Sequence, residues 1–212
     1  MNLAIANDWM HKNPFAGIRF QEKEVIREVL TKEEIERMMC KEFALPRLEY
    51  VRDVFIFCVF TGMAYVDVNN LRQEHIVRDN NDDLWIRKAR QKTNNMCNIP
   101  LLKIPQLLME KYKNHPLCTK TGALLPVPSN QKMNSYLKEI ADFCGIQKNL
   151  TTHTARHTFA TVVALANGVS MENIAKMLGH SDIRMTQRYA KVMDSSIMRD
   201  MENVDKLFKS SE

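Results

Sequence analysis

The feature that most constrains the fold is a break in the helical spacing of apolar residues between positions 75 and 100. Three short apolar runs, near residues 75–77, 84–86 and 97–99, are separated there by polar turn segments at 79–82 and 91–95. This alternation predicts a meander of three short strands. The sequence on both sides has the spacing of helices. We therefore predict an α+β domain that is mainly helical, with one small three-stranded antiparallel sheet.

Capping residues place the helices before and after this sheet. Thr31 followed by Glu34 forms a capping box, which predicts a helix to about residue 43. A strongly apolar helix over 47–60 should follow and end at Thr61-Gly62. After the strands, helical spacing returns over 104–112 and 130–143.

Three further helices are expected in the last third of the chain. Thr152, Ser170 and Ser181 can cap their N-termini, since each offers a hydroxyl to unpaired helix N–H groups. Gly168 and Gly179 can end the first two helices, and the third carries Tyr189. The apolar spacing after Tyr189 predicts one more helix from about residue 195.

Composition narrows the class of protein without fixing its function. Thirty Lys and Arg against 25 Asp and Glu give a net charge of +5, which suits a polyanionic partner but does not demand one. The five cysteines form no C-x-x-C pair, so neither a disulfide framework nor a zinc ribbon fits. Residues 1–20 do not have the pattern of a secretory signal, and no apolar run is long enough to span a bilayer. We expect a soluble cytoplasmic protein with no membrane partner.

Candidate chemical groups cluster in the last third. His153, Arg156 and His157 are three and four residues apart and so share one helix face. Taken alone, this spacing is more typical of a solvated surface. A metal site at His153 and His157 is disfavoured, because no Glu stands between them and no third ligand is evident. Two further candidates follow: His180 ends the run Leu-Gly-His, and Tyr189 lies nine residues later.

The order and spacing of these motifs resemble the tyrosine site-specific recombinase, or phage integrase, family. The resemblance includes Thr61-Gly62 and Lys92-Thr93 upstream and covers roughly residues 30–192. It implies that 29–212 form a catalytic domain with a C-terminal helix from about 195. It also implies that 1–28 are the end of an upstream DNA-clamping domain and a linker.

The resemblance assigns a role to each candidate residue. Tyr189 would attack a DNA phosphate and form a 3′-phosphotyrosine link without a metal or other cofactor. Arg156 would clamp the phosphate oxygens, His153 would help to move the tyrosine proton and His180 would donate to the phosphate. Lys92 would be the acid for the leaving 5′ oxygen. His157 is expected to be structural.

One position departs from the family pattern. The family has an arginine two residues after the Thr-Gly pair, where this chain has Ala64, while Asp67 keeps the acid that follows. Losing a charged donor to a phosphate typically costs about a hundredfold in rate. Either another cation substitutes, with Arg72 and Arg52 as candidates, or the chain is a paralogue that binds DNA with little or no cleavage. The retention of the other catalytic positions favours substitution.

The expected function is therefore an integrase of a mobile element, acting on duplex DNA rather than on a small molecule. Arg184, Arg188 and Lys191 are expected to contact the DNA backbone. The C-terminal helix would pack on a neighbouring subunit or fold back on its own domain. A DNA-binding regulator is the main alternative, since the helices around Gly168 could imitate a helix-turn-helix. A tyrosine-class topoisomerase or telomere-processing relative would share the chemistry.

Overall fold

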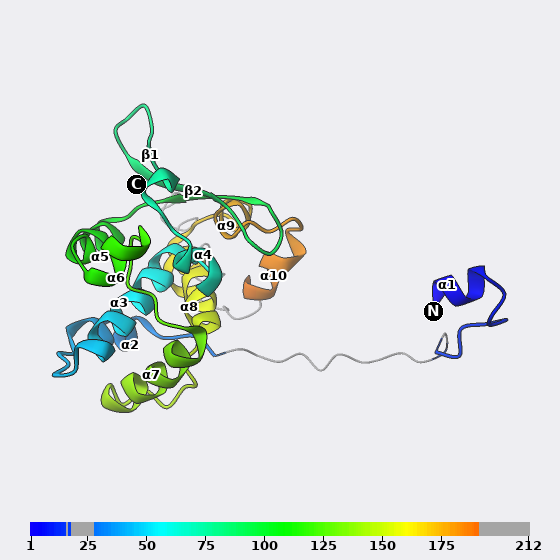
Figure 1. The fold of residues 1–212 in the computed structure, drawn as a ribbon, viewed down its shortest axis with the longest axis horizontal. Helices are drawn as coiled ribbons and strands as arrows, with labels where there is room; N and C mark the ends of the chain where they lie inside the picture. The colour runs from blue at the N-terminus through cyan, green and yellow to red at the C-terminus, as the bar shows by residue number, and fades with distance from the viewer. Residues whose placement is uncertain (16, 18–27, 191–212) are drawn as a thin grey trace, which may run out of the picture.

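The computed structural model of the chain describes residues 1–15, 17 and 28–190. Lys191 and the helix expected from about residue 195 lie outside the described residues. The α-helices are α1 (Asn2–Ala6), α2 (Lys32–Cys40), α3 (Pro46–Thr61), α4 (Tyr65–Asn69), α5 (Lys103–Tyr112), α6 (Pro116–Thr121), α7 (Asn130–Phe143), α8 (Thr152–Thr158), α9 (Met171–Leu178) and α10 (Arg184–Ala190). Figure 1 shows that those from α2 onward gather beside one small sheet. The prediction of a mainly helical α+β fold is confirmed.

The sheet is the predicted antiparallel meander, in the order β1 (Ile76–Arg78), β2 (Leu84–Ala89), β3 (Met96–Pro100). Ile86 at its centre pairs with Ile76 on one side and Ile99 on the other. Ile86 and Ile99 are buried, which fixes the register because a slip of one residue would turn them toward solvent. The hairpin joining β2 and β3 projects toward α10 and α9 (Figure 1).

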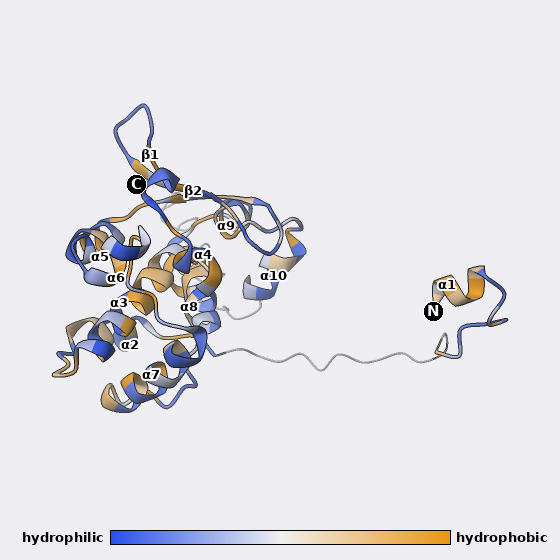
Figure 2. Cartoon of the chain, in the orientation of Figure 1, coloured by the Kyte–Doolittle hydropathy of each residue, from blue (hydrophilic) through white to orange (hydrophobic). Residues whose placement is uncertain are grey.

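The core is built around α3. Pro46 begins this helix, and from Val51 onward nearly every residue in it is buried, including Phe55 and Phe57. A helix that is apolar on all sides is stable only when other elements surround it. Helices α2, α5, α7 and α8 pack against it, and Figure 2 shows its apolar character among more polar neighbours. In the described part of the chain, no helix combines the length and apolarity that crossing a membrane requires.

Most predicted helix starts are confirmed, and two are corrected. The capping box of Thr31 and Glu34 is present, and Ser170 caps α9. Thr151 rather than Thr152 caps α8, because its hydroxyl accepts from the Thr154 N–H. The last helix begins at Arg184, whose N–H donates to the Asp182 side chain, rather than directly after Ser181.

The helix predicted to run from Thr152 to residue 166 changes geometry along its length. After α8 it continues as a π-helix, η2 (Phe159–Ala164), and a 3₁₀ turn, η3 (Leu165–Asn167), before Gly168. π-Helical segments occur often at functional sites. The short helices α4 and α6 were not predicted, since five and six residues do not show a full apolar period.

Candidate active site

Arg156 is the centre of the candidate site. It lies on α8 with 6% of its surface exposed. Its Nη1 donates to the Gly62 carbonyl and its Nη2 to the Leu178 carbonyl, both at 2.6 Å. These carbonyls belong to the C-terminal ends of α3 and α9, which leave backbone acceptors unpaired. The guanidinium is therefore held between two helix ends.

Gly62 explains part of this arrangement. It ends α3 in a left-handed conformation with φ of 67°. A Cβ at this position would lie 2.4 Å from Cδ1 of Phe159. Only glycine lets η2 approach closely enough for Arg156 to reach the carbonyl. The Thr-Gly pair noted in the sequence thus positions Arg156.

His180 follows α9 and contacts Arg156. Its Nε2 lies 3.2 Å from Nη2 of Arg156, and its Nδ1 lies 2.8 Å from Oγ1 of Thr186. Burial, helped by the positive charges of Arg156 and Arg90, lowers the pKa of His180 to about 4. The imidazole is therefore neutral near pH 7, and the network assigns Nε2 as the acceptor from Arg156 and Nδ1–H as the donor to Thr186.

Tyr189 on α10 packs against two histidines, His157 and His180. Its ring is stacked on His180, with centroids 6.3 Å apart and planes 11° apart. It meets the His157 ring edge-on at 5.1 Å. A small apolar cluster from η2, α9 and α10 seats the tyrosine, which is 8% exposed. The structure thus brings Arg156, His180 and Tyr189 into one chain of contacts.

His153 and Lys92 lie at the surface and are not buried with these three residues. His153 is exposed on α8, one turn before Arg156 and His157. Lys92 is exposed at the tip of the hairpin between β2 and β3. Their roles remain predictions.

The hairpin that carries Lys92 is nevertheless docked at both sides of its tip. The Gln91 N–H donates to Oδ1 of Asp67, and Nδ2 of Asn95 donates to the Gly179 carbonyl. Asp67, the acid retained beside Ala64, is 6% exposed. Lys92 therefore projects from a loop that is anchored next to His180.

The two arginines suggested as substitutes at Ala64 have other partners. Arg52 donates to three carbonyls at the end of α2, those of Met38, Met39 and Lys41. Arg52 also lies ten residues before Gly62, which is about 15 Å along a helix. Arg72 donates to the carbonyls of Asn69 and Leu71. Both guanidinium groups are thus engaged by backbone carbonyls, and the structure gives no support to either as the substitute.

A cation near the site that the sequence motifs did not single out is Arg90, directly after β2. Its side chain is 11% exposed, and its Nε lies 3.8 Å from Oδ2 of Asp67. Burial is the main reason that the pKa values of Arg156 and His180 are lowered, and the charge of Arg90 lowers both further. The alternation of side chains along a strand could have found it, because Ile86, Lys88 and Arg90 share one face and Ile86 is buried.

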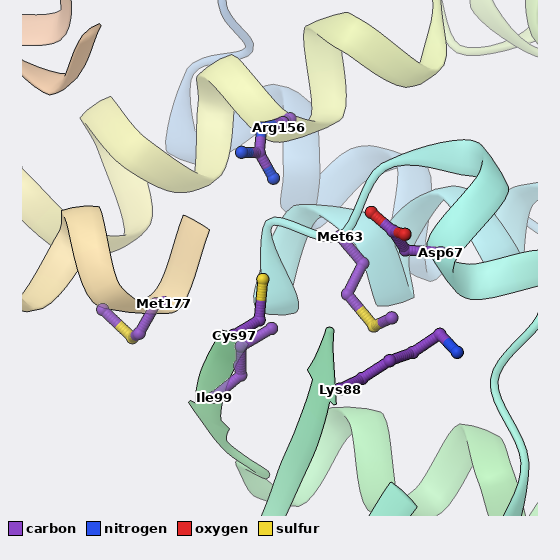
Figure 3. Close-up of a pocket in the computed structure, with 7 residues that line it drawn as sticks. All are labelled: Met63, Asp67, Lys88, Cys97, Ile99, Arg156 and Met177. Carbon is purple, nitrogen blue, oxygen red and sulfur yellow. The ribbon is translucent and has the colours of Figure 1, made fainter. Parts of the chain in front are cut away.

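A small pocket lies beside these groups. Figure 3 shows Arg156 above Cys97, with Asp67 to one side and the Lys88 amine directed away. Nζ of Lys88 instead lies 3.1 Å from Nε2 of His75. Burial raises the pKa of the Cys97 thiol to about 11, so it remains protonated. Within the described residues, no cluster of three or more His, Cys, Asp or Glu side chains could hold a metal ion.

Curated relatives match part of the chain. Tyrosine recombinase XerD of Staphylococcus saprophyticus is 40% identical over 95 residues, which are 45% of this chain and 31% of the relative. XerD of Staphylococcus aureus strain N315 is 42% identical over 71 residues, 34% of this chain and 24% of the relative. The matched segments thus span less than a third of these relatives.

Solved structures share the fold. A XerA recombinase has a TM-score of 0.63 at 23% identity, over 86% of this chain and 66% of the other. A lambda integrase (75–356) dimer bound to a COC′ core site has a TM-score of 0.67 at 19% identity, over 89% of this chain and 68% of the other. The Tn1549 transposon integrase in complex with a circular intermediate DNA has a TM-score of 0.67 at 18% identity, over 95% of this chain and 74% of the other.

A family model agrees with these similarities and covers more of the chain than the curated relatives do. The model described as "Phage integrase family" matches residues 28–196, about four fifths of the sequence. The chain belongs to the phage integrase family.

Proposed function

We propose that this chain is the catalytic domain of a site-specific DNA recombinase, an integrase that cleaves and rejoins duplex DNA through a 3′-phosphotyrosine at Tyr189. The observation that carries the proposal is the contact chain from the buried Arg156 guanidinium through the His180 imidazole to the Tyr189 ring. Family membership supports the same chemistry.

Arg156 and His180 suit the binding of a phosphodiester. A guanidinium presents planar donors that match two phosphate oxygens and stays charged even when buried. Two of its N–H groups bind backbone carbonyls here, which fixes its plane. An anion beside His180 would favour the protonated imidazole, so the ring could become a second donor to the phosphate.

The cleavage step balances without a cofactor. The Tyr189 oxygen attacks phosphorus, and the bond from phosphorus to the 5′ oxygen breaks. His153 takes the phenolic proton, and Lys92 gives a proton to the departing 5′ oxygen. The phosphotyrosine ester keeps the bond energy for rejoining, in which the same transfers run backward. The surface positions of His153 and Lys92 suit groups that meet DNA only when it binds.

Surface charge supports duplex DNA as the partner. Arg184 and Arg188 are exposed on α10, which also carries Tyr189, and we propose that they contact the DNA backbone. We further propose that residues 1–28 are the end of an upstream DNA-clamping domain and a linker, and that a C-terminal helix from about 195 mediates self-association on DNA. The protein would act in the cytoplasm.

Covalent trapping tests the function. A pool of nicked duplexes with randomised sequence around the nick is incubated with the protein, and protein-linked DNA is isolated in detergent and sequenced. Attachment at one preferred sequence is expected, and Tyr189→Phe should abolish it while DNA binding persists. DNA binding without attachment by the parent chain would instead indicate a regulator.

A further inference from the structure

We propose that Arg90 supplies the second phosphate-binding guanidinium of this active site, in place of the arginine missing at Ala64. The inference rests on the proposed function and names a further residue that would contact the scissile phosphate. In this arrangement one hairpin brings two cations to the DNA, Arg90 from its inner face and Lys92 from its tip.

The first support is the unsatisfied state of the Arg90 side chain. Its Nε is buried and has no hydrogen-bond partner among the described residues. Its ion pair with Asp67, at 3.8 Å, is too long for a hydrogen bond. A buried N–H without a partner costs free energy, so it is unusual unless a ligand completes it.

The second support is position. Gly179 lies between Leu178, whose carbonyl binds Arg156, and His180. A Cβ on Gly179 would lie 2.6 Å from Cδ of Arg90. The aliphatic stem of Arg90 therefore packs directly on the backbone that separates two groups of the site. Nε, the next atom of the same side chain, lies 3.8 Å from Oδ2 of Asp67.

The third support is the balance of charge. Asp67 lies 3.8 Å from Nε of Arg90, and its charge also acts on Arg156. Beside a neutral His180, the two guanidinium groups therefore carry more positive charge than Asp67 offsets. A phosphodiester carries one negative charge and gains more as phosphorus becomes five-coordinate. Buried charge of this kind is stable when a counter-ion can bind.

Single-turnover cleavage of a trapped substrate tests the proposal. Arg90→Ala should cleave about a hundredfold or more slowly, since one donor to a developing oxyanion is lost. The matched control is Arg87→Ala on the exposed, opposite face of β2, which should stay near the parental rate. The double variant Ala64→Arg/Arg90→Ala should recover at least about tenfold of the loss, because the cation returns from the other side. An Arg90→Ala variant that cleaves at the parental rate would overturn the proposal.

A neutral substrate separates charge from structure. With a methylphosphonate at the scissile position, the defect of Arg90→Ala should shrink to less than about tenfold, because less charge must be stabilised. A defect of unchanged size would show that Arg90 only supports the fold.

Phosphate binding by the free protein is a readout that does not need cleavage. Inorganic phosphate, compared with chloride at equal ionic strength, should raise the Tm of the parent and of Arg87→Ala but not of Arg90→Ala. If the parent never forms a DNA adduct yet shows this pattern, the recombinase function fails while the anion site stands. Equal phosphate-induced shifts in all three proteins would refute the anion site.

Discussion

Nε2 of His180 lies 3.2 Å from Nη2 of Arg156, so the imidazole accepts a hydrogen bond from the group proposed to clamp the phosphate. This relationship means that the DNA-free site holds a neutral histidine beside a permanent cation. Binding of a phosphate would change the partners of both groups together. His180 is therefore expected to report on the state of the site.

The pH dependence of stability should reveal the neutral His180. Its folded pKa is about 4, whereas an unfolded histidine has the ordinary value of 6.5. Between these two pH values the unfolded chain binds a proton at His180 that the folded chain does not bind. The contribution of the neutral imidazole to the free energy of unfolding is therefore complete above pH 6.5 and is lost as the pH falls toward 4. The free energy of unfolding of the parent should therefore approach that of His180→Gln as pH drops from 7 to 4.5. Denaturant titrations at each pH measure this, and parallel curves would contradict it.

Thr186 should orient His180. Its side chain is 1% exposed, and its hydroxyl lies 2.8 Å from Nδ1 of the imidazole. Thr186→Val keeps the shape but leaves the ring nitrogen without a partner, which costs about 1–3 kcal/mol. We expect a lower cleavage rate and a shifted pKa of His180. NMR of the imidazole resonances measures this titration. Thr161→Val is a matched control, because that buried hydroxyl bonds only the backbone of its own helix. A His180 titration unchanged by Thr186→Val would rule out the orienting role.

Local patterns in the sequence predicted the parts of the fold that are determined by residues adjacent in the sequence. The three strands follow from short apolar runs and turns, and helix α7 begins and ends at the predicted residues. Capping depends on small differences between adjacent residues, so Thr151 and Thr152 could not be ranked. The π-helical segment at 159–164 begins at Phe159, which packs closely on Gly62, a residue distant in sequence, so its local sequence did not predict it.

The sequence predicted the site residues that belong to recognisable motifs. It did not predict the residues whose positions depend on tertiary packing. Arg156, His180 and Tyr189 meet because α8, α9 and α10 pack together. The backbone partners of Arg52 and Arg72 became visible only in the structure. The inward direction of Arg90 depends on the strand register and on the absence of a side chain at Gly179.

Gly179 and Gly168 provide a matched pair for testing the close packing of Arg90. Both have a left-handed backbone, with φ of 61° and 81°. A Cβ on Gly168 meets no atom within 4 Å, whereas one on Gly179 overlaps Arg90 and Cys97. Gly168→Ala should lower the free energy of unfolding by about 1–2 kcal/mol, which is the cost of a left-handed backbone for alanine. Gly179→Ala should lower it by about 1–3 kcal/mol more, because its Cβ also overlaps neighbouring atoms. Gly179→Ala should also slow cleavage. Equal losses of stability in the two variants, measured by denaturant unfolding, would show that the hairpin does not pack here as described.

Asp67 should hold the hairpin in place through its two oxygens. One accepts from the Gln91 N–H at 2.9 Å and the other pairs with Arg90 at 3.8 Å. Asp67→Asn keeps the size but removes the charge, so it weakens the charge-assisted hydrogen bond and leaves Arg90 without its carboxylate. Amide hydrogen exchange over residues 90–95 should become faster, while exchange in α7 stays unchanged. Asp82→Asn in the other turn removes only an exposed ion pair with Arg78 and should leave exchange at 90–95 at the parental rate.

Because the same hairpin carries Arg90 and Lys92, Asp67→Asn should slow cleavage more than it weakens DNA binding. Unchanged exchange at 90–95 together with full cleavage would show that the hairpin is held by its other contacts alone.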